Sequence, residues 1–355
     1  MDGSRVDRVV QSAIDRQATP GACYAVGVHG SVRMAALGRL GYGDRWPLVG
    51  LDTLWDLASL TKVVGTTTAA MQLVEMGNLR LEQPVAKIIP SFEANGKSAV
   101  TVRNLLLHDS GLPASLHSPS QLHTAEEVLQ AVWAQPLGYE TGTQTVYSDV
   151  GFSVLGNVIE TLVGLSLDRY LREKVWALLG MTDTMFNPRP WLHVRCPPTE
   201  PVEPWRKSLR AERGIEQTEW IRGEVHDPTA MVLGGVAGHA GLFSTVRDLA
   251  KFMAALTGGK LVAASTLELF TTRTVAGGRA LGWDTPSAGS SAGARFGPRS
   301  YGHTGFTGTS IWVDPDLGLF AILLTNRVHP SADNQGIREL RAEFHDAVVE
   351  STRPI

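Results

Sequence analysis

The chain has 355 residues, and its 43% hydrophobic content is enough for a sizeable core, which excludes global disorder. Lys and Arg number 32 against 35 Asp and Glu, so the formal net charge of −3 supplies no basic field for a phosphate backbone, and we expect no nucleic-acid partner. The two cysteines, Cys23 and Cys196, exclude a disulfide-dense scaffold and a four-thiolate zinc site.

The predicted elements start with a helix and a hairpin. Apolar residues recur at helical spacing over residues 4–16, and two strand-like runs follow at 22–28 and 32–37. From Ser59 to about Met76 the pattern is helical and unusually rich in small side chains. Because small side chains let other elements approach closely, we expect this helix to be central and buried.

The middle third of the chain has mostly helical patterns. Helices are predicted at 101–108, 124–132, 154–162 and 166–179. Six prolines then fall between residues 188 and 204. Since proline is excluded from helix interiors and central strands, we expect an extended crossing segment there.

The last third returns to mixed structure. It predicts a helix over 245–256, strands at 309–313 and 318–325, and a final helix with apolar residues from 337 to 348. The second strand is apolar at nearly every position, so both of its faces should be covered. Strands at both chain ends with helices between them imply one sheet built from the two termini and a helical insertion.

A serine and a lysine stand three residues apart in Ser59-Leu60-Thr61-Lys62, and Lys62 is the only one of seven lysines with this spacing. Positions i and i+3 share a helix face, so the hydroxyl and the amine can meet. A buried lysine can accept the serine proton once desolvation lowers the lysine pKa, and a helix N-terminus offers N–H groups to an oxyanion. A chain of this length can also contain Ser-x-x-Lys by accident.

Two further short motifs carry chemistry. Tyr147-Ser148-Asp149 precedes a predicted helix. A phenol beside an ammonium ionises more easily and can shuttle protons. An ordinary tyrosine before a helix N-cap fits the motif equally well. His303-Thr304-Gly305 opens the C-terminal strands, where the glycine lets a ligand approach the backbone. Alone, neither motif identifies a function.

Together, and in this order, the three motifs resemble the serine β-lactamase and penicillin-binding-protein superfamily, with its Ser-x-x-Lys, Tyr-x-Asn-type and Lys-Thr-Gly-type elements. The resemblance runs from about Gly21 to Asn326 and is strongest to the class C β-lactamase-like branch, with its esterases and D-alanyl-peptide hydrolases. Residues 103–112 and 302–308 are typical of that branch. The segments 198–200, 223–227 and 234–244 resemble a sub-branch that includes peptidoglycan-fragment amidases and penicillin-binding-protein-type carboxypeptidases.

The pattern and the resemblance together predict an α/β (α+β) fold. It would have an antiparallel sheet built from both chain termini, flanked by helices, with a mostly helical inserted region. We place the sheet domain at residues 1–65 and 230–355 and the helical domain at 66–229. The active site should lie at their interface.

The resemblance implies a role for each matching residue. Ser59 would be the acylated nucleophile, and Lys62 and Tyr147 would share general base and acid work, with the order of proton transfers left open. The oxyanion hole would use the backbone N–H groups of Ser59 and Phe306. The expected substrate-binding residues are Asp149, His303, Thr304, Gly305 and His239.

Two residues depart from the family pattern. Asp149 stands where asparagine is common, and a carboxylate there would raise the pKa of Lys62 and oppose its use as a base. His303 replaces the strand lysine, which favours esters, or amides whose carboxylate lies elsewhere. If His303 contributes charge, the KM for an anionic substrate should rise as the pH climbs from about 5.5 to 8.

We therefore expect a serine hydrolase that forms an acyl-enzyme with an amide or ester, from a peptidoglycan fragment or a β-lactam-related compound. The alternatives are a generic carboxylesterase and a penicillin-binding or sensory module without turnover. No metal-ligand spacing and no nucleotide-binding glycine motif occurs, so we expect neither a metal nor a cofactor. Gly289–Gly293 matches Gly-x-Ser-x-Gly, but in a low-complexity loop, and we interpret it as non-functional.

The expected partner is a small molecule or a muropeptide substrate, and the oligomeric state is left open. No stretch approaches the ~20 continuous apolar residues that a membrane helix needs, so no membrane partner is expected. The first seven residues are typical of a polar helix start and not of a signal peptide. We expect a cytoplasmic protein, with a removed leader as the alternative.

Overall fold

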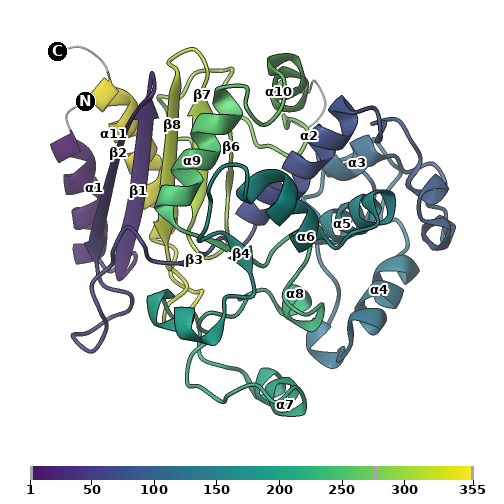
Figure 1. Cartoon of the computed structure of the whole chain (residues 1–355), viewed down its shortest axis with the longest axis horizontal. Coiled ribbons are helices and arrows are strands. Elements are labelled where there is room, and N and C mark those ends of the chain that lie inside the picture. The colour runs from purple at the N-terminus through teal and green to yellow at the C-terminus, as the bar shows by residue number, and fades with distance from the viewer. Residues whose placement is uncertain (1–2, 275–277, 353–355) are drawn as a thin grey trace.

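The two ends of the chain build one antiparallel sheet in the computed structural model, which describes residues 3–274 and 278–352 (Figure 1). The strand order is β2-β1-β8-β7-β6. The strands are β1 (Gly21–Val28), β2 (Ser31–Gly38), β6 (Tyr301–Thr304), β7 (Ser310–Asp314) and β8 (Leu319–Thr325). The predicted antiparallel sheet from both termini is therefore confirmed.

Helices cover both faces of this sheet (Figure 1). Tyr24 and Leu323, which pair across β1 and β8, pack with α1 (Gly3–Asp15) and α11 (Ile337–Thr352) on one face. The neighbouring pair, Cys23 and Leu324, faces the other way into the core beneath α9 (Val246–Thr257). Every residue of β8 is buried, which the apolar sequence of this strand predicted.

A smaller sheet joins three distant segments beside the large one. It consists of β3 (Trp55–Asp56), β5 (Leu242–Ser244) and β4 (Met185–Phe186), in the order β3-β5-β4. β3 ends three residues before Ser59, so this sheet determines where the chain enters the following helix.

The rest of the chain is mostly helical. The α-helices are α2 (Thr68–Glu75), α3 (Val102–Leu107), α4 (Ala125–Ala134), α5 (Asp149–Val163), α6 (Leu167–Leu171), α7 (Pro204–Glu212), α8 (Pro228–Val232) and α10 (Ala264–Thr271). Two π-helices, η1 (Lys62–Thr67) and η5 (Arg172–Trp176), continue into or from α-helices. Short 3₁₀ turns are η2 (Val85–Lys87), η3 (Pro90–Glu93), η4 (Pro119–Gln121) and η6 (Pro190–Arg195).

The helix predicted over 59–76 is buried, as its small residues indicated. Thr66, Thr67 and Thr68 have no exposed surface, and neither do the two alanines that follow. The helix differs from the prediction in its first part, which is a π-helix, a feature that often marks functional sites.

The proline-rich segment is less extended than predicted. Pro190 starts the 3₁₀ turn η6 and Pro204 starts α7. Proline is tolerated in the first turn of a helix because the N–H that it lacks has no partner there. The predicted domain boundaries, at residues 65/66 and 229/230, stay a prediction.

Among the residues that the structure describes, no single helix is long and apolar enough to cross a membrane. The helix pair Asp149–Val163 and Leu167–Trp176, bent by 70°, meets the length and composition criteria only when its two parts are taken together.

Candidate active site

A sharp turn places Ser59 at the start of the central helix. The carboxylate of Asp56, at the end of β3, accepts a hydrogen bond from the backbone N–H of Ala58 (2.8 Å). Ala58 has φ +45°, a left-handed conformation that non-glycine residues adopt rarely and mainly at functional sites. Ser59 follows this turn, half-buried, and lines a cleft of about 470 Å³.

Lys62 lies one helical turn further on and is fully buried. Its Nζ donates hydrogen bonds to Ser59 Oγ (3.1 Å), to Asp149 Oδ1 (2.6 Å) and to the carbonyl oxygen of His239 (2.9 Å). An ammonium has three protons, and all three are used. Burial alone would lower the pKa of Lys62, but the Tyr147 and Asp149 oxygens outweigh it and raise that pKa above its ordinary value.

Tyr147 approaches this pair from the start of α5, where Ser148 is the N-cap. The Lys62 Nζ lies 4.9 Å from the centre of the Tyr147 ring. The Tyr147 hydroxyl is buried and makes no hydrogen bond of standard geometry among the described residues, but it lies close enough to the Lys62 ammonium and the Ser59 hydroxyl to interact with both. Burial raises the pKa of Tyr147, while the nearby Lys62 charge opposes that rise.

The loop after β6 forms the opposite wall and is tied to the Ser59 turn. Thr307 Oγ1 donates to the carbonyl of Asp56 (2.8 Å), and Thr309 Oγ1 donates to the carbonyl of Leu57 (3.0 Å). Gly305, at the start of this loop, packs against the Ser59 turn: an added Cβ would lie 2.1 Å from Thr309 Oγ1 and 2.4 Å from the carbonyl oxygen of Leu57. Only glycine fits this close approach of two backbones.

Two residues with unpaired backbone N–H groups line the cleft in the described part of the chain. Ser59 and Phe306 both line it, and in the described part of the chain neither of their N–H groups donates to another protein atom. Phe306 itself is 52% exposed, and the Arg327 guanidinium lies 4.5 Å from its ring centre. The two N–H groups are thus free to bind the oxygen of a reacting carbonyl.

His303 lines the cleft but supplies no charge there. Its Nδ1 donates to the carbonyl of Thr304 (2.8 Å), and burial lowers its pKa to about 4. The ring is therefore neutral between pH 5.5 and 8, which is the interval in which the sequence-based hypothesis requires His303 to lose a positive charge. A KM that rises with pH from loss of His303 charge is not expected.

Two of the expected substrate-binding residues lie outside the cleft lining. Asp149 is held by Lys62. His239 is only 1% exposed, and its ring contacts Asp227 Oδ1 (2.9 Å) and Ser153 Oγ (2.8 Å). It is the carbonyl of His239 that holds Lys62, and substrate binding by the His239 side chain stays a prediction.

Sequence reasoning missed four arginines that line the cleft: Arg279, Arg327, Arg338 and Arg341. Arg279 is ion-paired with Asp284. Arg327 and Arg341 donate to backbone carbonyls, and Arg338 forms no ion pair within the described ranges. The i, i+3 spacing of Arg338 and Arg341 at the start of the last helix was the available signal.

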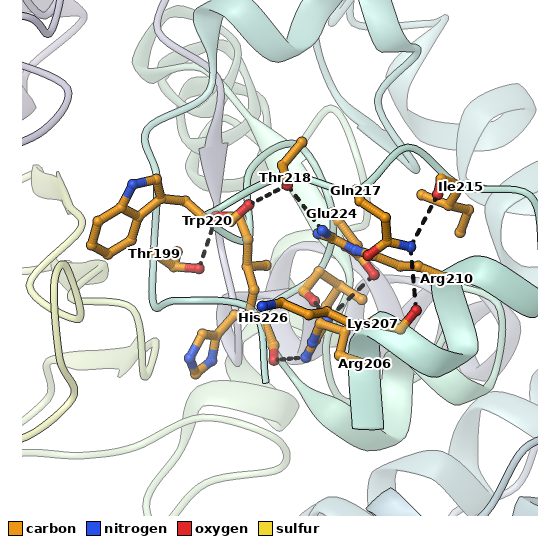
Figure 2. A network of polar contacts seen from close by, with 12 residues as sticks. Thr199, Arg206, Lys207, Arg210, Ile215, Gln217, Thr218, Trp220, Glu224 and His226 are labelled. Carbon is orange, nitrogen blue, oxygen red and sulfur yellow. Dashed lines mark hydrogen bonds and ion pairs between the residues drawn. The ribbon is translucent and has the colours of Figure 1, made fainter. Parts of the chain in front are cut away.

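A polar network behind the cleft supports the Phe306 wall. Figure 2 shows Arg206 and Arg210 reaching from α7 toward Glu224 and the main chain of His226. The His226 N–H donates to Asp56 (2.7 Å), and its ring stacks on Phe306 with 5.5 Å between centres. A larger cavity of about 900 Å³ is lined by residues from the end of α7 and from 213–225, with others from 187–193 and 231–235, and none of the predicted catalytic residues is among them.

The residues that the structure describes contain no group of three or more His, Cys, Asp or Glu side chains placed to hold a metal ion.

Comparison with solved structures finds chains of similar fold over nearly the whole length. EstCE1, a hydrolase with promiscuous acyltransferase activity, has a TM-score of 0.77 at 22% identity and covers 98% of each chain. A class C beta-lactamase has a TM-score of 0.77 at 19% identity, covering 99% of this chain and 97% of the other. At such identities these likenesses show the fold alone.

The sequence comparisons are more specific. An Escherichia coli K12 protein named "Putative D-alanyl-D-alanine carboxypeptidase" is 34% identical over 314 residues, which is 80% of this chain and 71% of that protein. A Salmonella typhimurium protein of the same name is 32% identical over 309 residues, with the same coverage. The family model Beta-lactamase matches residues 6–346. The chain is a serine hydrolase of the beta-lactamase fold, and it belongs to the beta-lactamase family.

Proposed function

We propose that Ser59 attacks the carbonyl of a peptide that ends in D-alanine, of the kind found in peptidoglycan fragments, and forms an acyl-enzyme that water then hydrolyses. The observation that carries this is the 3.1 Å contact between Lys62 Nζ and the Oγ of Ser59, which lines an open cleft. The names of the curated relatives support the substrate class.

The proton of Ser59 passes to the Lys62–Tyr147 pair as the Oγ–carbon bond forms. The backbone N–H groups of Ser59 and Phe306 bind the oxyanion. The pair then gives the proton to the leaving amine, so the amide bond breaks and neutral amine departs. In the second half a water loses its proton to the same pair and attacks the acyl carbon, which releases the acid and restores the Ser59 hydroxyl.

The charge of the cleft favours an anionic substrate. The cleft lining includes four arginines and only one carboxylate, that of Asp284, which is paired with Arg279. Arg338 has no ion-pair partner among the described residues. A peptide carboxylate would satisfy this surplus of positive charge. Arg338 would thus supply the cation that the neutral His303 lacks.

The test measures D-alanine release from a short peptide ending in D-Ala-D-Ala and from the same peptide with a C-terminal carboxamide. We expect the free acid to be preferred, and Ser59→Ala to abolish both turnover and labelling by a serine-directed phosphonate. Arg338→Gln should raise the KM of the acid roughly fivefold and leave that of the amide unchanged, as loss of one exposed charge contact implies. Arg247→Gln, an exposed arginine of α9, is the control.

Other outcomes point to the alternatives. Turnover of a simple nitrophenyl ester without any D-alanine release would indicate a carboxylesterase. A penicillin adduct on Ser59 that is never released would indicate a binding module, for which the fully hydrogen-bonded Lys62 ammonium is the structural argument. Equal labelling of Ser59→Ala and the parent would overturn the proposal.

A further inference from the structure

His108 contacts the chain on both sides of Tyr147. Its carbonyl accepts a hydrogen bond from the backbone N–H of Val146 (2.8 Å), and its Nδ1 accepts one from the backbone N–H of Ser148 (2.9 Å). One residue, at the end of α3, thus fixes the main chain immediately before and immediately after the tyrosine.

The ring of His108 also supports the ring of Tyr147 directly. The two ring centres are 4.6 Å apart at an interplanar angle of 33°. Phe152, on the first turns of α5, stacks on His108 with centres 5.0 Å apart. With only 1% of its surface exposed, His108 is held between an element of the active site and the core.

The Ser148 contact determines the protonation state of His108. A backbone N–H can only donate, so Nδ1 presents its lone pair and the ring proton is on Nε2. Burial, together with the charges of Arg279 and Lys62, holds the pKa of His108 well below its ordinary value, so the ring stays neutral. A proton on Nδ1 would break the contact that holds Ser148.

The Tyr147 hydroxyl needs such support. Among the residues described it makes no hydrogen bond of standard geometry, although the Lys62 ammonium and the Ser59 hydroxyl interact with it, so the main chain and ring packing contribute to its direction. Lys62 offers its ammonium 4.9 Å from the ring centre, but all three Lys62 protons are used elsewhere.

We propose that His108 is a positioning residue, which acts through Tyr147 by holding its phenol toward Ser59 and Lys62 for proton transfer. The proposal rests on the function proposed above. It assigns a role to the 103–112 segment, which is typical of the branch by sequence and none of whose residues lines the cleft.

Two variants separate the hydrogen bond from the backbone conformation. His108 has φ +59°, in the left-handed region where glycine and asparagine are both tolerated. His108→Asn keeps an acceptor near the position of Nδ1, and His108→Gly removes it. We expect His108→Gly to lower kcat by about 100-fold with KM changed less than about threefold, as displacement of a catalytic group by about 1 Å does. His108→Asn should recover kcat to within about tenfold of the parent.

The readouts keep structural damage apart from the proposed role. Thermal unfolding shows that each variant is folded at the assay temperature, and phosphonate labelling shows that Ser59 is still present and reactive. A folded His108→Gly with the kcat of the parent would overturn the proposal, as would His108→Asn failing as badly as His108→Gly. Activity that survives Ser59→Ala would instead overturn the proposed function.

A second measurement does not depend on any variant being stable. Imidazole ¹⁵N spectra of the parent, assigned with His108→Asn, should show His108 as the neutral Nε2–H form across pH 5.5 to 8. A Nδ1–H form, or titration of His108 in this interval, would contradict the proposal that Nδ1 accepts the Ser148 N–H and so positions Tyr147.

Discussion

Lys62 shows how one buried charge can be held in place by its surroundings. A lysine removed from water normally loses its proton more easily, because its charged form is poorly solvated. Here the Asp149 carboxylate lies 2.6 Å away and the His239 carbonyl 2.9 Å away, so the ammonium is solvated by the protein instead. The pKa of Lys62 and that of Tyr147 are both raised, for opposite reasons: nearby oxygens for the amine, and burial for the phenol.

The raised pKa values of Lys62 and Tyr147 predict that activity increases toward alkaline pH. One proton must leave the Lys62–Tyr147 pair before Ser59 can be deprotonated, and which group loses it does not alter the sign. We expect kcat/KM to rise from about pH 7 to 9, roughly tenfold per unit for a single proton. Steady-state hydrolysis of a neutral nitrophenyl ester measures this, and a flat or falling profile would contradict it.

Asp149 can be tested in the same assay. Its carboxylate raises the pKa of Lys62, so Asp149→Asn should lower that pKa and move the rising part of the profile to lower pH. Asp44→Asn, at a fully exposed carboxylate, should leave the profile unchanged. A shift to higher pH in Asp149→Asn would show that the carboxylate serves another purpose.

At the scale of elements, the site depends on how the turn after β3 meets the loop after β6. Threonine hydroxyls on that loop bond to the carbonyls of Asp56 and Leu57, and Gly305 lets the two backbones come together. Hydrogen bonds therefore hold the nucleophile turn and the oxyanion-binding loop together. Each supplies one of the two free N–H groups at the cleft.

Gly305→Ala should break this unit. The new Cβ would lie 2.1 Å from Thr309 Oγ1 and 2.4 Å from the carbonyl oxygen of Leu57, so one backbone must shift. We expect a loss of about 1–3 kcal/mol in unfolding free energy, with a larger loss of acylation rate because the two N–H groups separate. Chemical unfolding and burst kinetics measure the two effects.

Gly138→Ala is the matched control, since its nearest atom would be 3.8 Å from the added Cβ. It should keep both stability and acylation. Normal acylation in Gly305→Ala would show that the loop adapts and that the close approach is not needed.

For the molecule as a whole, several histidines are folded into the interior as neutral rings. Burial lowers the pKa of His303 to about 4 and that of His345 to about 3, and it holds the pKa of His108 well below its ordinary value. Below about pH 6.5 the unfolded chain binds protons on these groups and the folded chain does not. The folded state must therefore lose stability as the pH falls.

We expect the unfolding free energy to decrease from about pH 6.5 down to about pH 4. His303 alone should account for on the order of 3 kcal/mol of this decrease, from 1.36 kcal/mol per unit of pKa difference. Urea unfolding at several pH values measures the slope. His303→Gln should make the slope shallower, whereas His117→Gln, at an exposed histidine, should not. Identical slopes in the parent and His303→Gln would contradict this account.

Local patterns were sufficient for much of the fold. The apolar runs at both ends predicted a shared sheet, and the small residues of the 59–76 helix predicted that it is buried. The i, i+3 spacing of Ser59 and Lys62 predicted their contact, since a helix face depends only on neighbouring residues. The π-helical geometry from Lys62 onward has no such local signature.

The sequence by itself determined what depends on short separations along the chain: the elements, their apolar faces and the pairing of a hydroxyl with an amine one turn apart. Tertiary structure decided contacts between residues 40 positions apart, as for His108 and Ser148, and 87 apart, as for Lys62 and Asp149. It also decided that the His239 carbonyl holds Lys62 while the His239 ring contacts Asp227, and that Arg338 lines the cleft. Packing of the whole chain determines which side chains come into contact and which are buried away from water. Contact with charged groups and burial in turn determine the pKa values, and therefore the charges, at the site.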